Sequence, residues 1–497
     1  MTEFASTRNK RNTVSAHEAV IKGLADDGGL YTPLSVNARI DPKEVLNQPY
    51  QKIAAKVIGS ILDDYSEEEI NDCVNGAYDE KFDTEEIVPL NKISDGYLME
   101  LWHGPTSAFK DIALTILPRL LTRAYQKENR NDTIAILTAT SGDTGKAALS
   151  GFADVPHTAI TVFYPEVGVS PVQKKQMQTS KGKNVDVIAV KGNFDDCQRM
   201  VKQAVNDPEV KASLHNVQIS SANSINIGRL VPQITYYYSS YAKLCEQGEI
   251  RPGDEINFVV PTGNFGDILA GYFAKLLGLP VHKLICASNT NNVLTDFLKT
   301  GTYSIHRQFH TTMSPSMDIL ISSNLERLLF LMSDYDDAFV KDAMEKLSRD
   351  GSYTIPADLH QKITSVFSGY WSSEEECVET IHDLWNNEHV LIDPHTSVAL
   401  HAMRQYRKET GDQRPCVVLS TASPYKFCKD VLHCIDEESI SDDFEAMDRL
   451  HEITGVKVPS NLSELKNLPV RFNRSIEIKD GMHVIAERMK EIGDVHD

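Results

Sequence analysis

The sequence predicts an α/β protein built around parallel β-sheets, because strand-like runs alternate with helical patterns along most of the chain. The runs TIAILTAT (133–140), TAITVFYP (158–165) and VDVIAVKG (185–192) are apolar and rich in β-branched residues, as buried strands are. A glycine loop and a helical pattern follow the first run, and EINFVVPTGNFGDILAGYFAKLLG (255–278) repeats that order. Successive strand, helix and strand segments place the strands parallel in one sheet.

The 497 residues are enough for two or three domains, and we place two boundaries between them. Residues 1–88 are predicted to form a mainly helical N-terminal domain. Residues 89–250 and 251–497 are predicted to form two α/β halves. Within the second half, residues 334–388 read as helical and polar, and CVVLST (416–421) is the last predicted strand.

Composition and charge narrow the possible partners. Hydrophobic residues make up 41% and charged residues 24% of the chain, as in ordinary soluble globular proteins. A net charge of −20 would repel nucleic acid and anionic membranes, so neither is expected as a partner. The chain shows no apolar run long enough for a membrane span and no apolar leader core, so the cytoplasm is the expected location. The eight cysteines lack zinc-like spacing, and no metal is expected.

One lysine stands where a strand-like segment becomes a helix. YLMELW (97–102) is predicted as a strand, and apolar residues recur at helical spacing after HGPTSAFKDIAL (103–114). Lys110 lies beside Phe109 in the second segment. Partial desolvation there would lower the pKa of its amine and make it nucleophilic, as a Schiff-base lysine must be. Taken alone, a lysine at a helix start is more often solvated.

SGDTGKAAL (141–149) first suggests a nucleotide-binding loop. A P-loop requires GxxxxGK followed by Ser or Thr, but here Ala147 follows the glycine–lysine pair and Thr140 stands in place of the first glycine. What remains is a helix start, whose free N–H groups and dipole suit a carboxylate or phosphate. By itself the loop is equally compatible with a simple helix N-cap.

PTGNFGD (261–267) is a second glycine loop at a helix start. Gly263 and Gly266 let the backbone approach a bound phosphate closely. Two anion-suited helix starts and one candidate Schiff-base lysine match a cofactor with a phosphate and an aldehyde, together with an amino-acid carboxylate. Pyridoxal 5'-phosphate fits that description.

Six motifs, in order along the chain, carry a resemblance to a known family. They are GLADDGGLYTP (23–33), SAFKD (107–111), ATSGDTG (139–145), PTGNFGD (261–267), SPSMDILISSNLERLLF (314–330) and STASPYKF (420–427). Together they resemble threonine synthases of the larger bacterial and fungal type, over about residues 6–427. The resemblance implies a fold type II pyridoxal-phosphate enzyme, with two α/β halves around the cofactor and a family-specific N-terminal domain.

The same resemblance implies roles for individual residues. Lys110 would be the Schiff-base lysine and the proton shuttle. The cofactor's phosphate would lie on a loop formed by Gly263, Asn264, Phe265, Gly266 and Asp267. The hydroxyl of Thr421 would face the ring nitrogen, and Asp143 would lie near the ring oxygen, on a loop whose Thr140, Ser141 and Thr144 take the substrate carboxylate. The substrate phosphate would be held by Asn223, Ser224, Asn226, Arg229 and Lys426.

Two departures from related sequences bear on this interpretation. Many family members read TAHP near the last strand, where this chain has Ser423 in place of the histidine. Related dehydratases follow the lysine with x-Arg-Gly and bind phosphate with a nearly continuous glycine run. Here Asp111 follows Lys110 and the loop reads GNFG, which disfavours a dehydratase.

The implied reaction converts O-phospho-L-homoserine and water to L-threonine and phosphate, in a monomer or homodimer. One alternative is a phospho-lyase that acts on the same substrate and releases 2-oxobutanoate. Another is a non-catalytic pyridoxal-phosphate-binding protein. A P-loop kinase is disfavoured by Ala147.

Overall fold

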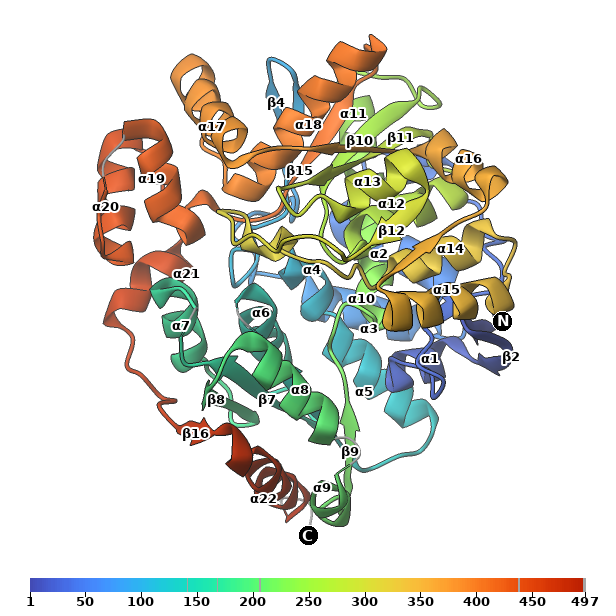
Figure 1. The fold of residues 1–497 in the computed structure, drawn as a ribbon, viewed down its shortest axis with the longest axis vertical. Coiled ribbons are helices and arrows are strands. Elements are labelled where there is room, and N and C mark those ends of the chain that lie inside the picture. The colour runs from blue at the N-terminus through green and yellow to red at the C-terminus, as the bar shows by residue number, and fades with distance from the viewer. Residues whose placement is uncertain (141, 168, 205–206, 437–438, 495–497) are drawn as a thin grey trace.

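The computed structural model describes residues 1–140, 142–167, 169–204, 207–436 and 439–494, and its core is two β-sheets (Figure 1). The larger sheet has six strands in the order β14 (Phe367–Trp371), β11 (Val281–Ser288), β10 (Ile256–Pro261), β15 (Cys416–Ser420), β5 (Gly96–Glu100) and β4 (Leu90–Ile93). The smaller sheet has five, in the order β16 (Ser475–Glu477), β8 (Val185–Lys191), β7 (Thr158–Pro165), β6 (Thr133–Ala139) and β9 (Val217–Ser220).

Neighbouring strands in both sheets run parallel, apart from the antiparallel pair β4 and β5. The predicted α/β class with parallel sheets is confirmed. The boundaries at 88/89 and 250/251 stay predictions. The sheets exchange strands across the second boundary, since β4 and β5 join β15 while β16 joins β8.

Helices cover both faces of each sheet. In the larger sheet, Phe258 and Val260 of β10 pack in the core beneath α11 (Ile234–Glu246) and α12 (Gly266–Leu276), while Val259 points to the opposite core beneath α18 (Pro394–Thr410). In the smaller sheet, α6 (Asp143–Phe152) packs on one face, while α8 (Phe194–Ala204) and α22 (Gly481–Asp494) pack on the other. Burial on both faces explains why these strands read as continuous apolar runs.

The remaining helices connect and flank these layers. They are α1 (Ala16–Lys22), α2 (Tyr50–Ile61), α3 (Glu67–Ala77), α4 (Lys110–Leu114), α5 (Leu117–Lys127), α7 (Pro171–Gln178), α9 (Pro208–Ala212), α10 (Ile227–Leu230), α13 (Val293–Thr300), α14 (Leu325–Met332), α15 (Asp337–Asp350), α16 (Ala357–Val366), α17 (Glu374–Glu388), α19 (Cys428–Asp436), α20 (Asp443–Thr454) and α21 (Ser460–Ser463).

The N-terminal region contains a small antiparallel sheet that the sequence did not predict. Its strands are β1 (Phe4–Ser6), β2 (Asn9–Val14) and β3 (Tyr31–Pro33), in the order β2-β1-β3. Two of them are only three residues long, and β2 reads NKRNTV, which lacks an apolar alternation. Helices α1, α2 and α3 account for most of the regular structure here, as expected.

Residues 334–388 are mostly helical, as predicted, but they also contain two short strands that the sequence did not reveal. Besides α15, α16 and α17 this segment contains β13 (Ser352–Thr354), which pairs with β12 (Thr302–Ser304), and the edge strand β14. β14 reads FSGYW, which is too short for periodicity to reveal, and its glycine permits close packing, since a Cβ on Gly369 would lie 3.0 Å from the Cα of Thr295.

The chain beyond β15 links the two sheets. Helices α19, α20 and α21 lie at the left of Figure 1, and the chain then returns to the smaller sheet as β16 and α22. On the way Asn461 reaches the lysine-bearing loop, where it accepts a hydrogen bond from Ser107 Oγ at 2.9 Å and donates one to Gly104 O at 3.2 Å.

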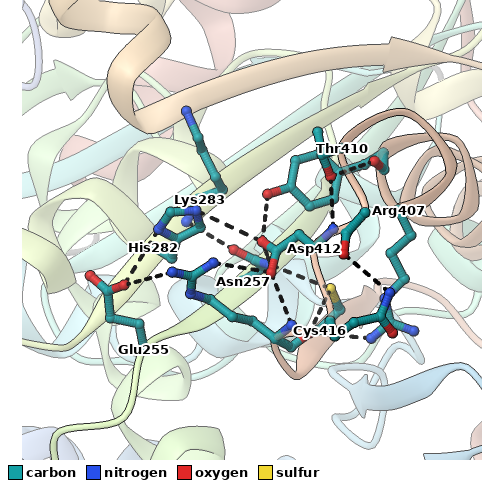
Figure 2. Close-up of polar contacts among 12 residues, drawn as sticks. Glu255, Asn257, His282, Lys283, Arg407, Thr410, Asp412 and Cys416 are labelled. Carbon is teal, nitrogen blue, oxygen red and sulfur yellow. Dashed lines mark hydrogen bonds and ion pairs between the residues drawn. The ribbon is translucent and has the colours of Figure 1, made fainter.

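A polar cluster fixes the amino ends of three central strands (Figure 2). Asp412 Oδ2 accepts hydrogen bonds from Asn257 Nδ2 at 2.9 Å and Tyr406 Oη at 2.7 Å, and Asn257 Oδ1 accepts one from Lys283 N at 3.1 Å. Burial opposes ionisation of Asp412, but its hydrogen bonds lower the pKa of this carboxyl well below the usual range. The cluster aligns β10, β11 and β15, so their carboxyl ends are presented together at the other edge, where ligands bind in such sheets.

No helix in the described ranges is long and apolar enough to cross a membrane. Among the same residues, no three His, Cys, Asp or Glu side chains gather as a metal ion would require.

Candidate active site

Backbone hydrogen bonds join the loop that carries Lys110 to the loop after β15. Phe109 N donates to Thr421 O at 2.8 Å, and Ser423 N donates to Ser107 O at 3.1 Å. Ser107 has a φ of 58°, in the left-handed region that non-glycine residues rarely adopt, and these hydrogen bonds hold it there. Two predicted site residues, Lys110 and Thr421, are thereby brought together.

Lys110 begins helix α4 and lies among charged groups. Burial of its amine lowers the pKa to about 8, with Asp143 opposing the change and Arg229 and Lys426 adding to it. Its Nζ lies 3.5 Å from Ser316 Oγ. A lysine with this pKa keeps a useful fraction of neutral, nucleophilic amine near pH 7.

Asp143 and Lys426 form an ion pair inside the protein. Asp143 Oδ1 lies 2.6 Å from Lys426 Nζ and 3.0 Å from Gln173 Nε2, and Lys426 Nζ also donates to Thr106 O at 2.8 Å. Burial opposes ionisation of the carboxyl, but the cations Lys426 and Lys110 lower the pKa of Asp143 well below its usual range. Asp143 is therefore a fixed negative charge beside the candidate Schiff-base lysine.

In the loop before α6, some polar groups are hydrogen-bonded within the loop itself. Thr140 Oγ1 accepts hydrogen bonds from Gly142 N and Gly145 N, each at 3.1 Å, so this hydroxyl stabilises the helix start. Thr144 is half-buried. Ser141, the third residue predicted to hold the substrate carboxylate, lies outside the described residues.

The second glycine loop leads into α12. Phe265 has a φ of 61°, and Asn264 O accepts hydrogen bonds from Asn324 N at 3.0 Å and Asn324 Nδ2 at 3.1 Å. A Cβ on Gly263 would lie 2.6 Å from Ser316 O, so only glycine fits. The first N–H groups of α12, from Gly266 onward, have no acceptor within the helix and are suited to a phosphate.

The carboxyl of Asp267 is hydrogen-bonded to two tyrosine side chains. Its carboxyl accepts hydrogen bonds from the hydroxyls of Tyr236 and Tyr237, the second at 3.1 Å. Burial raises the pKa of Asp267 to about 7. Its Oδ2 has no partner among the described residues, and its predicted cofactor role stays a prediction.

The segment SANSINIGR (221–229) places one cation at the site. Arg229 is buried and donates from Nη1 to Ala222 O at 2.9 Å, while its Nε lacks a partner in the described part of the chain. Burial lowers the pKa of Arg229 to about 10. An unpartnered buried guanidinium nitrogen is costly unless a ligand completes it.

The three polar residues predicted to act with Arg229 differ in their burial and hydrogen bonding. Asn226 is fully buried, caps α10 by accepting from Gly228 N at 2.8 Å, and donates to Val20 O at 3.0 Å. Asn223 is exposed and Ser224 half-buried. Asn226 is thus committed to joining α1 to this segment, whereas Asn223 and Ser224 keep their side chains available to a ligand.

Several residues at the site were not found from the sequence. The hydroxyl of Ser316 contacts the amine of Lys110, and the backbone N–H of Ser316 donates a hydrogen bond to His395 Nε2 at 3.2 Å. Arg327 is buried and donates to Tyr31 O at 3.0 Å, to Ile225 O at 2.6 Å and to Asn324 Oδ1 at 2.5 Å. The resemblance motif at 314–330 contains Ser316 and Arg327, so that motif was the available signal for both.

Family comparisons agree with this architecture. The family of pyridoxal-phosphate dependent enzymes matches residues 85–422, the family described as threonine synthase N terminus matches 3–78, and that described as threonine synthase, C-terminal matches 396–479. The threonine synthase of Schizosaccharomyces pombe is 37% identical over 86% of this chain and 88% of its own length. The chain belongs to the threonine synthase family.

Solved structures of the family have the same fold. A pyridoxal-phosphate-bound threonine synthase from Brucella melitensis has a TM-score of 0.88 and 33% identity, covering 99% of this chain and 100% of that one. Yeast threonine synthase has a TM-score of 0.87 and 32% identity, covering 98% of this chain and 99% of that one. Human Threonine synthase-like 1 is 37% identical over 86% of this chain, which spans 58% of that protein's length.

Proposed function

We propose that this protein is a threonine synthase that converts O-phospho-L-homoserine and water to L-threonine and phosphate. The observation that carries the proposal is the setting of Lys110, a lysine of lowered pKa placed with Asp143, Arg229 and Lys426. O-phospho-L-homoserine carries a carboxylate and a phosphate, and the site offers cations and helix N-termini that suit both anions. Family membership supports the same substrate.

The residues present fit pyridoxal 5'-phosphate. Lys110 would hold its aldehyde carbon, the backbone of residues 263–267 its phosphate, Thr421 its ring nitrogen and Asp143 its ring oxygen. When bound, the cofactor withdraws electrons from the substrate's α-carbon. The close packing at Gly263 and the helix start at Gly266 form the kind of cradle that a phosphate requires.

The protein's own groups would position the substrate and move its protons. Thr140, Ser141 and Thr144 would face the substrate carboxylate, and Arg229 its phosphate together with Asn223, Ser224, Asn226 and Lys426. Lys110 would take the α-carbon proton and carry protons between the α and β carbons. Since Lys426 is paired with Asp143, its contribution to phosphate binding would be mainly through its field.

Three further attributes belong to this proposal. The acidic net charge of −20 disfavours nucleic acid and anionic membrane partners. We propose a cytoplasmic location, and a monomer or homodimer as the active form.

Product analysis tests the proposal against a phospho-lyase. Supplied with O-phospho-L-homoserine, the holoenzyme should release threonine and phosphate in nearly equal amounts. Phosphate matched by 2-oxobutanoate would identify a lyase and overturn the synthase proposal.

Borohydride reduction tests the assignment of Lys110. We expect the reduced cofactor on the peptide that contains Lys110, and a loss of at least roughly 10²-fold in kcat for Lys110→Ala, as for a removed general acid–base group. Lys146→Ala is the matched control, because burial also lowers the pKa of Lys146 to about 8 while its Nζ donates to Ser180 Oγ at 3.2 Å. Label on another lysine would contradict the assignment.

A further inference from the structure

Ser316 touches two parts of the site at once. It lies in a short 3-10 turn, η3 (Pro315–Met317). Its hydroxyl oxygen is 3.5 Å from Lys110 Nζ, and its carbonyl oxygen packs where a Cβ of Gly263 would be, 2.6 Å away. The position of this one residue therefore sets both the surroundings of the lysine amine and the shape of the glycine loop.

A buried histidine holds the backbone of Ser316. Ser316 N donates to His395 Nε2 at 3.2 Å, and His395 Nδ1 lies 2.7 Å from Asp393 Oδ1. Because Nε2 accepts a hydrogen bond, the ring carries its proton on Nδ1, which donates to the carboxylate. His395 is 2% exposed and Asp393 fully buried, so water does not compete for either group.

Asp393 is itself held by several groups. It caps α18, accepting from His395 N at 2.9 Å, and its other oxygen accepts from the hydroxyl of Thr396. That hydroxyl also lies 3.1 Å from Ser420 Oγ, next to Thr421. The pair of Asp393 and His395 is therefore anchored both to a long helix and to the end of β15, one residue from a predicted cofactor contact.

The turn around Ser316 is equally well fixed. Asp318 accepts hydrogen bonds from Thr312 N at 3.0 Å, Asn289 Nδ2 at 2.8 Å and Asn291 Nδ2 at 3.0 Å. These contacts tie the turn to the end of β11. The backbone that carries the Ser316 hydroxyl is therefore fixed in place, as the positioning of a reacting group requires.

We propose that Ser316 is a catalytic hydrogen-bond partner of the Lys110 amine, and that His395, oriented by Asp393, is the positioning residue that aims Ser316. The proposal rests on the assignment of Lys110 as the Schiff-base lysine. Lys110 has to alternate between bonding to the cofactor and acting as a free amine. The Ser316 hydroxyl accepts a hydrogen bond from the freed amine and keeps it directed at the substrate.

The chemistry of the pair favours positioning over simple packing. Apolar side chains of the same volume would fill this part of the core without burying a carboxylate, which is expensive to desolvate. The imidazole Nε2 accepts the hydrogen bond of Ser316 N–H, and Asp393 sets the orientation of the ring. The other charged groups that face Lys110 are Asp111, Asp143, Arg229 and Lys426.

The test follows recapture of pyridoxal 5'-phosphate by the apoenzyme across a pH range. Schiff-base formation needs the neutral amine, so the pH midpoint of its rate reports the pKa of Lys110. Ser316→Ala removes an acceptor that stabilises the ammonium, so the midpoint should fall. Ser316→Thr keeps the hydroxyl and should restore the midpoint.

A double variant tests whether His395 acts through Ser316. His395→Phe should lower the midpoint in the natural background and leave it unchanged in the Ser316→Ala background, because coupled residues are not additive. In holoenzyme assays Ser316→Ala should reduce kcat roughly tenfold to hundredfold, as expected for a lost hydrogen bond to a charged group. If His395→Phe does not fold, the two Ser316 variants decide alone, since both leave His395 and Asp393 in place.

An unchanged midpoint in Ser316→Ala, or an additive effect of His395→Phe, would overturn the proposal. Failure of the underlying assignment looks different. In that case borohydride would fix the cofactor to a lysine other than Lys110, whatever the Ser316 variants do.

Discussion

At the scale of single residues, the site keeps opposite charges in places that water does not screen. The side chain of Lys426 is fully buried and that of Asp143 is 3% exposed, yet both are ionic partners at 2.6 Å. Removing one partner of such a pair leaves an uncompensated buried charge, so neither residue is replaceable alone. In a chain of net charge −20, local cations of this kind would be needed to bind the anionic substrate that we propose.

Arg229 gives a prediction at this scale. Its guanidinium has an unpartnered Nε among the described residues, and a lysine there cannot reproduce the planar fork that grips a phosphate. Arg229→Lys should weaken binding of inorganic phosphate to the holoenzyme by roughly tenfold, about 1.4 kcal/mol. The cofactor should stay bound. Titration with phosphate, followed through the cofactor's absorbance, measures both.

The matched control for Arg229→Lys is Arg349→Lys, because the side chain of Arg349 is 68% exposed and remote from any ligand contact proposed above. The control should bind phosphate as the natural protein does. Equal phosphate affinity in Arg229→Lys and the control would move the phosphate site away from Arg229.

At the scale of elements, the glycine loop and η3 act as one unit. Gly263 O accepts a hydrogen bond from Ser322 Oγ at 2.7 Å, Asn264 O accepts from Asn324, and Ser316 O packs on Gly263. Residues 314–324 therefore form the outer wall of the loop. A change in one of these elements is felt by the other, because packed interiors do not deform freely.

Gly263→Ala tests this coupling. The added Cβ would meet backbone, 2.6 Å from Ser316 O, so the loop or η3 has to shift. We expect cofactor affinity to fall at least roughly tenfold, in line with an overpacking penalty of about 1–3 kcal/mol. The measurement is equilibrium dialysis of the cofactor.

A methyl group added elsewhere separates this effect from a general change in stability. Gly59 lies in α2, and a Cβ there would have its nearest neighbour, Ile70, at 4.0 Å. Gly59→Ala should bind the cofactor normally and should be slightly more stable, since alanine favours a helix. Normal cofactor affinity in Gly263→Ala would show that the loop is not the phosphate cradle.

The elements that the sequence revealed are those with strong local patterns. β7 coincides with the predicted 158–165, because both of its faces are buried and its run is apolar throughout. β14 was missed because five residues around a glycine carry no readable period. The helix starts at Asp143 and Gly266 were visible from glycine and cap residues.

The contacts within the site were less predictable than its elements. Lys110, Arg229 and Lys426 are separated by more than a hundred residues each, and only the fold brings their charges together. His395 was not predicted because its contact is with the backbone of Ser316, and a backbone contact leaves no side-chain motif. Asp267 was predicted to lie on the cofactor-phosphate loop, which stays a prediction, and its carboxyl meets two tyrosines whose positions no local pattern specified.

At the scale of the whole molecule, a buried arginine and a partly buried histidine join the N-terminal region to the rest. Arg327 donates from α14 to Tyr31 O and Ile225 O, so it links β3, the segment before α10 and the wall of the glycine loop. Glu326 beside it accepts from Arg8 Nη2 at 2.8 Å. The N-terminal region is thereby connected to the elements that would hold the cofactor and the substrate phosphate.

His103 joins the same regions through charge. Its Nδ1 lies 2.6 Å from Asp83 Oδ1 and its Nε2 lies 2.8 Å from Glu100 Oε2, so both nitrogens donate when the ring is protonated. Burial opposes protonation, but the two carboxylates outweigh it and raise the pKa of His103 from its ordinary 6.5 to about 9. A raised pKa means that the folded protein binds the proton more tightly than the unfolded chain does.

The sign of this linkage gives the last prediction. The stabilisation from His103 is fully present below pH 6.5 and is lost as the pH rises through about 9. Because Asp83 is half exposed, screening reduces the effect to roughly 1–3 kcal/mol in the free energy of unfolding. Denaturant titrations should therefore show His103→Gln less stable than the natural protein at about pH 6, with the gap closing by about pH 10. The control is His382→Gln, which replaces a side chain that is 51% exposed and should be as stable as the natural protein at every pH. If the stability difference between His103→Gln and the natural protein did not change with pH, the ring would contribute by packing alone.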